Sequence, residues 1–105
     1  MAGSETFACD LSALSAEERA RRHALAASLP KAITELQELA DGYAISVNPG
    51  VLSARDLGEF VGLEQRCCPF LTFRIVAGTS GEVSTLEVTG APGAKQFIAS
   101  AFGLA

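Results

Sequence analysis

The sequence is poor in the residues that proteins use to bind nucleic acids or to cross membranes. It has 8 Lys and Arg against 12 Asp and Glu among 105 residues, and its formal net charge is −4. The basic residues are scattered except for Arg19, Arg21 and Arg22, so nothing attracts a phosphate backbone. No apolar run approaches the roughly 18 to 20 residues of a bilayer span, and the first residues lack the regions of a signal peptide. We therefore expect a cytoplasmic protein without a nucleic-acid or membrane partner.

Several catalytic and binding motifs are also missing. The segment from Gly90 to Gly93 has neither the spacing nor the lysine of a phosphate-binding loop, and no Ser, His and Asp set stands out as a triad. The one histidine, His23, lies on a charged helix face, where we expect it to be solvated. The 3 cysteines are an odd count in a chain without an export signal. A disulfide framework is therefore not expected, and the thiols should be reduced.

What remains is enough apolar surface for a single core. Hydrophobic residues make up 49% of the chain and charged residues 19%, which is typical of a globular protein. The length is common for one domain, so we expect residues 1–105 to form a single α+β domain.

A long helical region is predicted in the first part of the chain. Ser15 and Glu18 have the spacing of a capping box, so a helix begins near Ala16. An apolar stripe then runs through Leu25, Leu29, Ile33 and Leu36. This periodicity predicts a helical region to about Leu39, either one helix kinked at Pro30 or two pieces joined there.

Two further helices are predicted. Ser53 and Asp56 repeat the capping-box spacing, and Pro69 stops the helix that they start near Cys68. The last helix follows Gly93.

Three strands are predicted at residues 43–47, 70–76 and 83–88. The first alternates apolar and small residues, and a glycine-containing loop at 78–81 joins the other two as a hairpin. The order α-β-α-β-β-α predicts an α+β fold with helices on one face of a three-stranded antiparallel sheet, in the strand order 1-3-2. This is a reduced ferredoxin-like arrangement.

Glu64 is the anomalous residue of the second predicted helix. It shares one stripe, at spacings of three and four, with Leu57, Phe60, Val61, Cys67 and Cys68. A carboxylate turned toward a core is costly unless it is paired, protonated or bound to a metal. The alternative is a glutamate at the edge of the stripe that reaches water or caps a backbone amide.

The neighbouring cysteines are candidate metal ligands. Pro69 ends the helix, so Cys68 can leave helical dihedrals and both sulfurs can face one cavity. Two soft thiolates suit Zn(II), Cu(I) or Hg(II), although the spacing is not that of a zinc finger. Cys9, in an extended segment beside Asp10, can supply a third sulfur. The alternative for each cysteine is packing as a small apolar residue.

The same location argues against a spontaneously reactive thiol. The negative end of the helix and Glu64 should both raise the thiol pKa. Arg66 or Arg74 offsets this only if its side chain reaches the sulfurs. We therefore favour metal binding over thiol catalysis.

In the segment from Glu64 to Phe70, the chain resembles a group of small bacterial proteins marked by a Glu-x-x-Cys-Cys-Pro-Phe motif. The similarity covers nearly the whole chain and extends to Cys9-Asp10-Leu11-Ser12-x-Leu14, Asp41-Gly42-Tyr43 and Leu86-x-Val88-Thr89-Gly90. Members are often associated with heavy-metal resistance or metal-responsive regulators. The resemblance implies metal handling by Cys9, Glu64, Cys67 and Cys68 without defining an activity.

Three functions follow as hypotheses. The first is a cytoplasmic sensor, buffer or carrier of a thiophilic ion, with Cys9, Cys67 and Cys68 as ligands and Glu64 as a fourth ligand or a base beside them. The second is a thiol-dependent enzyme, either a lyase of metal-carbon bonds with Glu64 as proton donor or a thiol-disulfide catalyst. The third is an interaction module with its cysteines in the core, a homodimer joined through an exposed sheet edge.

Overall fold

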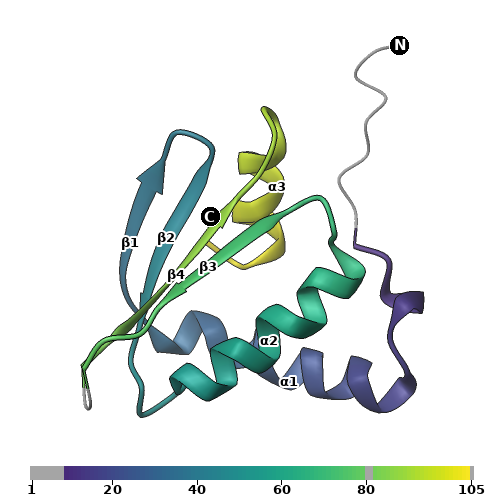
Figure 1. Cartoon of the computed structure of the whole chain (residues 1–105), viewed down its shortest axis with the longest axis horizontal. Coiled ribbons are helices and arrows are strands. Elements are labelled where there is room, and N and C mark those ends of the chain that lie inside the picture. The colour runs from purple at the N-terminus through teal and green to yellow at the C-terminus, as the bar shows by residue number, and fades with distance from the viewer. Residues whose placement is uncertain (1–8, 80–81, 105) are drawn as a thin grey trace.

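The computed structural model describes residues 9–79 and 82–104 as an α+β fold (Figure 1). A four-stranded antiparallel sheet packs against three α-helices, and a short 3₁₀ helix precedes them. The elements in chain order are η1 (Leu11–Ala13), α1 (Ala16–Ala32), β1 (Ile33–Leu39), β2 (Gly42–Val47), α2 (Ala54–Cys67), β3 (Thr72–Val76), β4 (Ser84–Thr89) and α3 (Ala94–Ala101).

The sheet is built from two hairpins whose later strands pair with each other. β1 pairs with β2 and β3 with β4, and β2 pairs with β4, so that the order is β1-β2-β4-β3. The three predicted strands correspond to β2, β3 and β4, and their relative order 1-3-2 agrees with the prediction. The three-stranded, reduced ferredoxin-like sheet is wrong in its strand count, because β1 adds a fourth strand at one edge.

The extra strand replaces the last seven residues, 33–39, of the first predicted helix. Helix α1 ends at Ala32, two residues beyond Pro30, and residues 33–39 continue as β1. The β-branched Ile33 and Thr34 favour a strand at this point. A backbone hydrogen bond of 2.8 Å from Asn48 N to Ala32 O then fixes the end of the helix beside the end of β2.

Gly42 permits the close approach of the two central strands. It opposes Thr89 in the register of β2 and β4. A Cβ atom at Gly42 would lie 1.9 Å from the carbonyl oxygen of Val88. Glycine is therefore required where β2 begins.

One face of the sheet carries the core. Along β4 the buried residues Ser84, Leu86 and Val88 alternate with half-buried ones. Leu86 and Val88 belong to the same buried cluster as side chains from all three α-helices, including Leu29, Phe60 and Ile98. Within the described residues, no helix combines the length and the apolar character that crossing a membrane requires.

Helices α1 and α2 begin with the predicted capping boxes. Ser15 with Glu18 and Ser53 with Asp56 each exchange side-chain and backbone hydrogen bonds. Ion pairs then join α1 to α2, with Arg22 paired to Glu64 and Glu18 paired to Arg66. Figure 1 shows the two helices running in roughly opposite directions. The C-terminal end of α2 therefore lies beside the first turns of α1.

Candidate metal centre

Four donor groups converge at the C-terminal end of α2. The sulfurs of Cys9, Cys67 and Cys68 and a carboxylate oxygen of Glu64 all lie within 4.8 Å of one another. Cys67, Cys68 and Glu64 are completely buried, whereas Cys9 is half-buried. The structure thus brings together the four residues that the sequence singled out, and this group could hold a metal ion.

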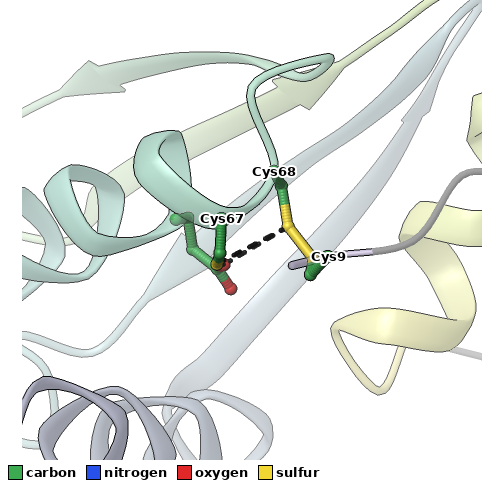
Figure 2. A group of neighbouring side chains, drawn as sticks. Cys9, Cys67 and Cys68 are labelled. Atoms are coloured by element: carbon green, nitrogen blue, oxygen red, sulfur yellow. Dashed lines mark hydrogen bonds between the residues drawn. A yellow bond between two sulfur atoms is a disulfide. The ribbon is translucent and has the colours of Figure 1, made fainter. Parts of the chain in front are cut away.

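The break in the helix at Cys68 aligns the two adjacent sulfurs. Cys68 has φ −126° and ψ 64°, outside the helical region, as expected for a residue before Pro69. Its N–H still donates to the Glu64 carbonyl oxygen at 2.6 Å, which holds the residue against the last turn. The Cys67 and Cys68 sulfurs consequently lie 3.9 Å apart (Figure 2).

Cys9 reaches the site from the chain segment before η1. Asp10 N donates to Cys67 O at 2.7 Å, and this backbone bond holds the segment against the end of α2. Cys9 and Cys68 form a disulfide across a sequence separation of 59, with their Cα atoms 4.7 Å apart (Figure 2). The prediction of three reduced thiols is therefore wrong for this structure. Cys67 alone is a free thiol.

Glu64 is paired with an arginine from the neighbouring helix. Arg22 donates from Nε to Glu64 Oε2 at 3.2 Å and from a terminal nitrogen to Oε1 at 2.9 Å. Because Arg22 is mostly buried as well, burial alone would lower its pKa. The hydrogen bonds and the charge of Glu64 outweigh burial and raise the pKa of Arg22. The pair satisfies a carboxylate that would otherwise be isolated in the core.

The arginines considered from the sequence do not reach the site. Arg66 binds Glu18 and the carbonyl of Ala13. Arg74 is exposed on β3, and its guanidinium lies 3.4 Å from the carboxylate of Glu87 on β4. No role at the site was predicted for Arg22.

A signal for Arg22 was present in the spacing of α1. Arg22 lies three residues before Leu25 and seven before Leu29, which places it on the buried stripe of the helix. It is a charged residue on a buried face, as Glu64 is on α2. His23, one position on, is exposed, in agreement with its predicted solvation.

The free thiol is held in its protonated form. Burial is the main cause that raises the pKa of Cys67, followed by its hydrogen bond to Glu64 and the charge of that carboxylate, to about 11. Arg22 acts in the opposite direction with a smaller effect. The Cys67 sulfur donates to Glu64 Oε2 at 3.2 Å. The predicted upward shift and the contribution of Glu64 to it hold for Cys67, but burial, which was not predicted as a cause, is the largest one.

The comparisons with known proteins add no relative. Neither the family models, nor the curated proteins, nor the solved structures yield a match to this chain. The resemblance carried by Glu64 to Phe70 therefore stays a prediction.

Proposed function

We propose that the reduced protein binds a thiophilic metal ion as a sensor, buffer or carrier. The thiolates of Cys9, Cys67 and Cys68 are the sulfur ligands, and Glu64 Oε2 is the fourth donor. The observation that carries the proposal is the convergence of three sulfurs and one carboxylate oxygen within 4.8 Å. Soft thiolates gathered in this way select Zn(II), Cu(I) or Hg(II) over hard cations.

The spacing of the donor atoms agrees with coordination of one ion. Two sulfurs bonded at about 2.3 Å to one tetrahedral zinc ion lie about 3.8 Å apart, and a sulfur and an oxygen ligand about 3.5 Å apart. The Cys67 and Cys68 sulfurs are 3.9 Å apart, and they lie 3.2 and 3.6 Å from Glu64 Oε2. Little movement of these three residues is needed to hold an ion between them.

Arg22 adjusts the charge of the site. Three thiolates and one carboxylate in a buried position are strongly negative, and charge buried without compensation is costly. The guanidinium lies 2.9 Å from Glu64 Oε1 and offsets part of this charge. A divalent ion neutralises more of the remainder than a monovalent one, which favours Zn(II) or Hg(II) over Cu(I).

The burial of two cysteines also supports the alternative function, in which the cysteines only pack in the core. Cys67 and Cys68 are completely buried and belong to the hydrophobic cluster. Packing, however, does not require a buried carboxylate beside the thiols, and replacing a buried ion pair with apolar residues is often neutral or stabilising. The Arg22 and Glu64 pair is therefore the feature that favours a binding site.

Equilibrium binding tests the proposal. The full chain, reduced and handled without oxygen, is titrated with Zn(II) or Hg(II) in competition with a chromophoric chelator. We expect one ion per chain and an affinity lowered at least about 100-fold in the Cys67→Ala, Cys68→Ala double variant, because two of the three sulfur ligands are lost. The single variants serve if the double variant does not fold.

The control replaces an arginine outside the site. Arg74→Gln removes an exposed ion pair of β3 and should leave the affinity unchanged. Equal affinity in the wild type and in both single cysteine variants would overturn metal binding by these thiols, and would leave core packing as their role.

A further inference from the structure

We propose that the Cys9–Cys68 disulfide is a reversible redox latch that closes the metal site, and that small thiols open it. This inference rests on the proposed function and adds its regulation. The disulfide uses two of the three sulfurs of the cluster. A sulfur in a disulfide has no thiolate to offer a metal, so the oxidised and metal-bound states exclude each other.

A backbone contact separate from the sulfur bond also joins the two segments that the latch connects. The hydrogen bond from Asp10 N to Cys67 O, at 2.7 Å, sets Cys9 beside the end of α2. The side chain of Asp10 also accepts a hydrogen bond from Ser12 N at 3.1 Å, which shapes the chain entering η1. Reduction therefore leaves the Cys9 segment beside the other ligands, and the Cys9 and Cys68 sulfurs must separate from about 2 Å to about 3.8 Å to share one ion.

Exposure decides where an external thiol enters. Cys68 is completely buried, whereas Cys9 is half-buried and lies on the chain segment that precedes η1. A thiolate from solvent therefore attacks the Cys9 sulfur, and the sulfur–sulfur bond breaks with release of the Cys68 thiolate. A second thiolate then attacks the external sulfur of the mixed disulfide and releases the Cys9 thiolate. Two small thiols supply the two electrons and leave as their own disulfide, and the reverse reaction closes the latch.

Cys67 is kept out of the exchange by its place in the helix. It directly precedes Cys68, and its thiol donates to Glu64 Oε2 at 3.2 Å. Its sulfur remains 3.9 Å from that of Cys68. We therefore expect one oxidised pairing, between Cys9 and Cys68, and a Cys67 thiol in both states.

Peptide mapping tests the pairing independently of metal. The full chain is equilibrated without metal in mixtures of a small dithiol and its cyclic disulfide, the remaining thiols are alkylated, and trypsin is added. Cleavage yields residues 1–19, with Cys9, and residues 67–74, with Cys67 and Cys68. The two peptides should be linked in oxidising mixtures and separate in reducing ones. The link should persist in Cys67→Ala and disappear in Cys68→Ala.

Metal titration of the same samples tests whether the closed latch prevents metal binding. We expect Zn(II) affinity to fall by on the order of 100-fold or more when the disulfide forms, because two ligands are withdrawn. Cys9→Ser retains two thiols and cannot close the latch. It should bind Zn(II) more weakly than the reduced wild type, but equally in mild oxidising and reducing mixtures.

The outcomes separate the latch from the metal proposal. Peptides that never link, or a link through Cys67, would overturn the latch whatever the metal affinity. Equal Zn(II) affinity of the linked and the reduced protein would overturn the regulation of metal binding by the disulfide, while metal binding itself stands. If the pairing is found but the reduced protein binds neither Zn(II) nor Hg(II), the proposed function fails, and its regulation by the disulfide is refuted with it.

Discussion

At the scale of single residues, the unusual feature of the core is the buried ion pair of Arg22 and Glu64. Glu64 is completely buried, and its carboxylate accepts both from Arg22 and from the Cys67 thiol. We expect Arg22→Met to lower the free energy of unfolding by about 3 kcal/mol, because it leaves a buried charge without its partner. Urea denaturation of the reduced, metal-free proteins measures the change.

The matched variants identify the cause. Arg21→Met removes exposed pairs with Asp56 and Glu59 and should cost under about 1 kcal/mol. Glu64→Leu should cost about 1 to 3 kcal/mol through the unpaired guanidinium. The combination of Arg22→Met with Glu64→Leu should recover most of the loss. Additive losses in that double variant would contradict a direct interaction of the two residues.

A second prediction concerns the stability of the protein at alkaline pH. The pKa of Cys67 is raised from its ordinary value of 9.0 to about 11, chiefly by burial and then by Glu64. Between these two values the unfolded state has lost the proton that the folded state still holds, so the contribution of Cys67 to stability is present below pH 9 and is lost as the pH rises toward 11.

The difference between wild type and Cys67→Ala isolates this contribution from other titrating groups. Both proteins are denatured by urea at several pH values from 8 to 11. We expect the stability of the wild type to fall more steeply with pH than that of the variant. Parallel curves would show that the folded state does not hold the Cys67 proton.

Residue periodicity predicted part of the site. The spacing of three and four revealed Glu64, and it places Arg22 on the buried stripe of α1 in the same way. The position of Cys9 had no such signal. It depends on a backbone hydrogen bond between Asp10 and Cys67. Local sequence patterns do not predict a contact between residues so far apart in the sequence.

At the scale of elements, β1 shows why a helical pattern can be misread. Leu29, Ile33 and Leu36 fit a helical stripe, but the chain changes from helix to strand between the first two. As an edge strand, β1 has exposed residues on both faces, and Leu36 is itself 38% exposed. The alternation that marks a half-buried strand is therefore missing. Pairing with β2 decides the structure, and that pairing is not local.

The two central strands provide the next prediction. Gly42→Ala would place a Cβ atom 1.9 Å from the carbonyl oxygen of Val88, so β2 and β4 must separate locally. We expect a loss of more than about 2 kcal/mol in the free energy of unfolding, with lost ladder hydrogen bonds as its cause. Thermal or urea denaturation followed by circular dichroism measures it.

Gly62→Ala is the matched control on α2. Nothing lies within 4 Å of a Cβ atom at that position, and alanine is the better helix former. This variant should gain about 0.5 to 1 kcal/mol. A loss of similar size at both glycines would contradict the close approach of the strands as the specific cause.

At the scale of the whole molecule, the disulfide ties the segment before η1 to the far end of α2. It closes a loop over a sequence separation of 59 that contains α1, β1, β2 and α2. Constraining a loop of about 60 residues in the unfolded chain is worth about 4 kcal/mol in the chain-entropy model. Oxidation and metal binding should therefore be alternative ways of stabilising the same fold.

The last prediction compares these two ways. Relative to the oxidised protein, the reduced, metal-free protein should lose up to about 4 kcal/mol, seen as a lower midpoint of urea denaturation. Zn(II) at about 100 times its dissociation constant should restore about 2.7 kcal/mol to the reduced protein, because the assembled site exists only in the folded state. Cys9→Ser should denature at the same midpoint with and without a reducing agent. If neither reduction nor Zn(II) changes the midpoint of urea denaturation of the wild type, this end of α2 is held by core packing alone.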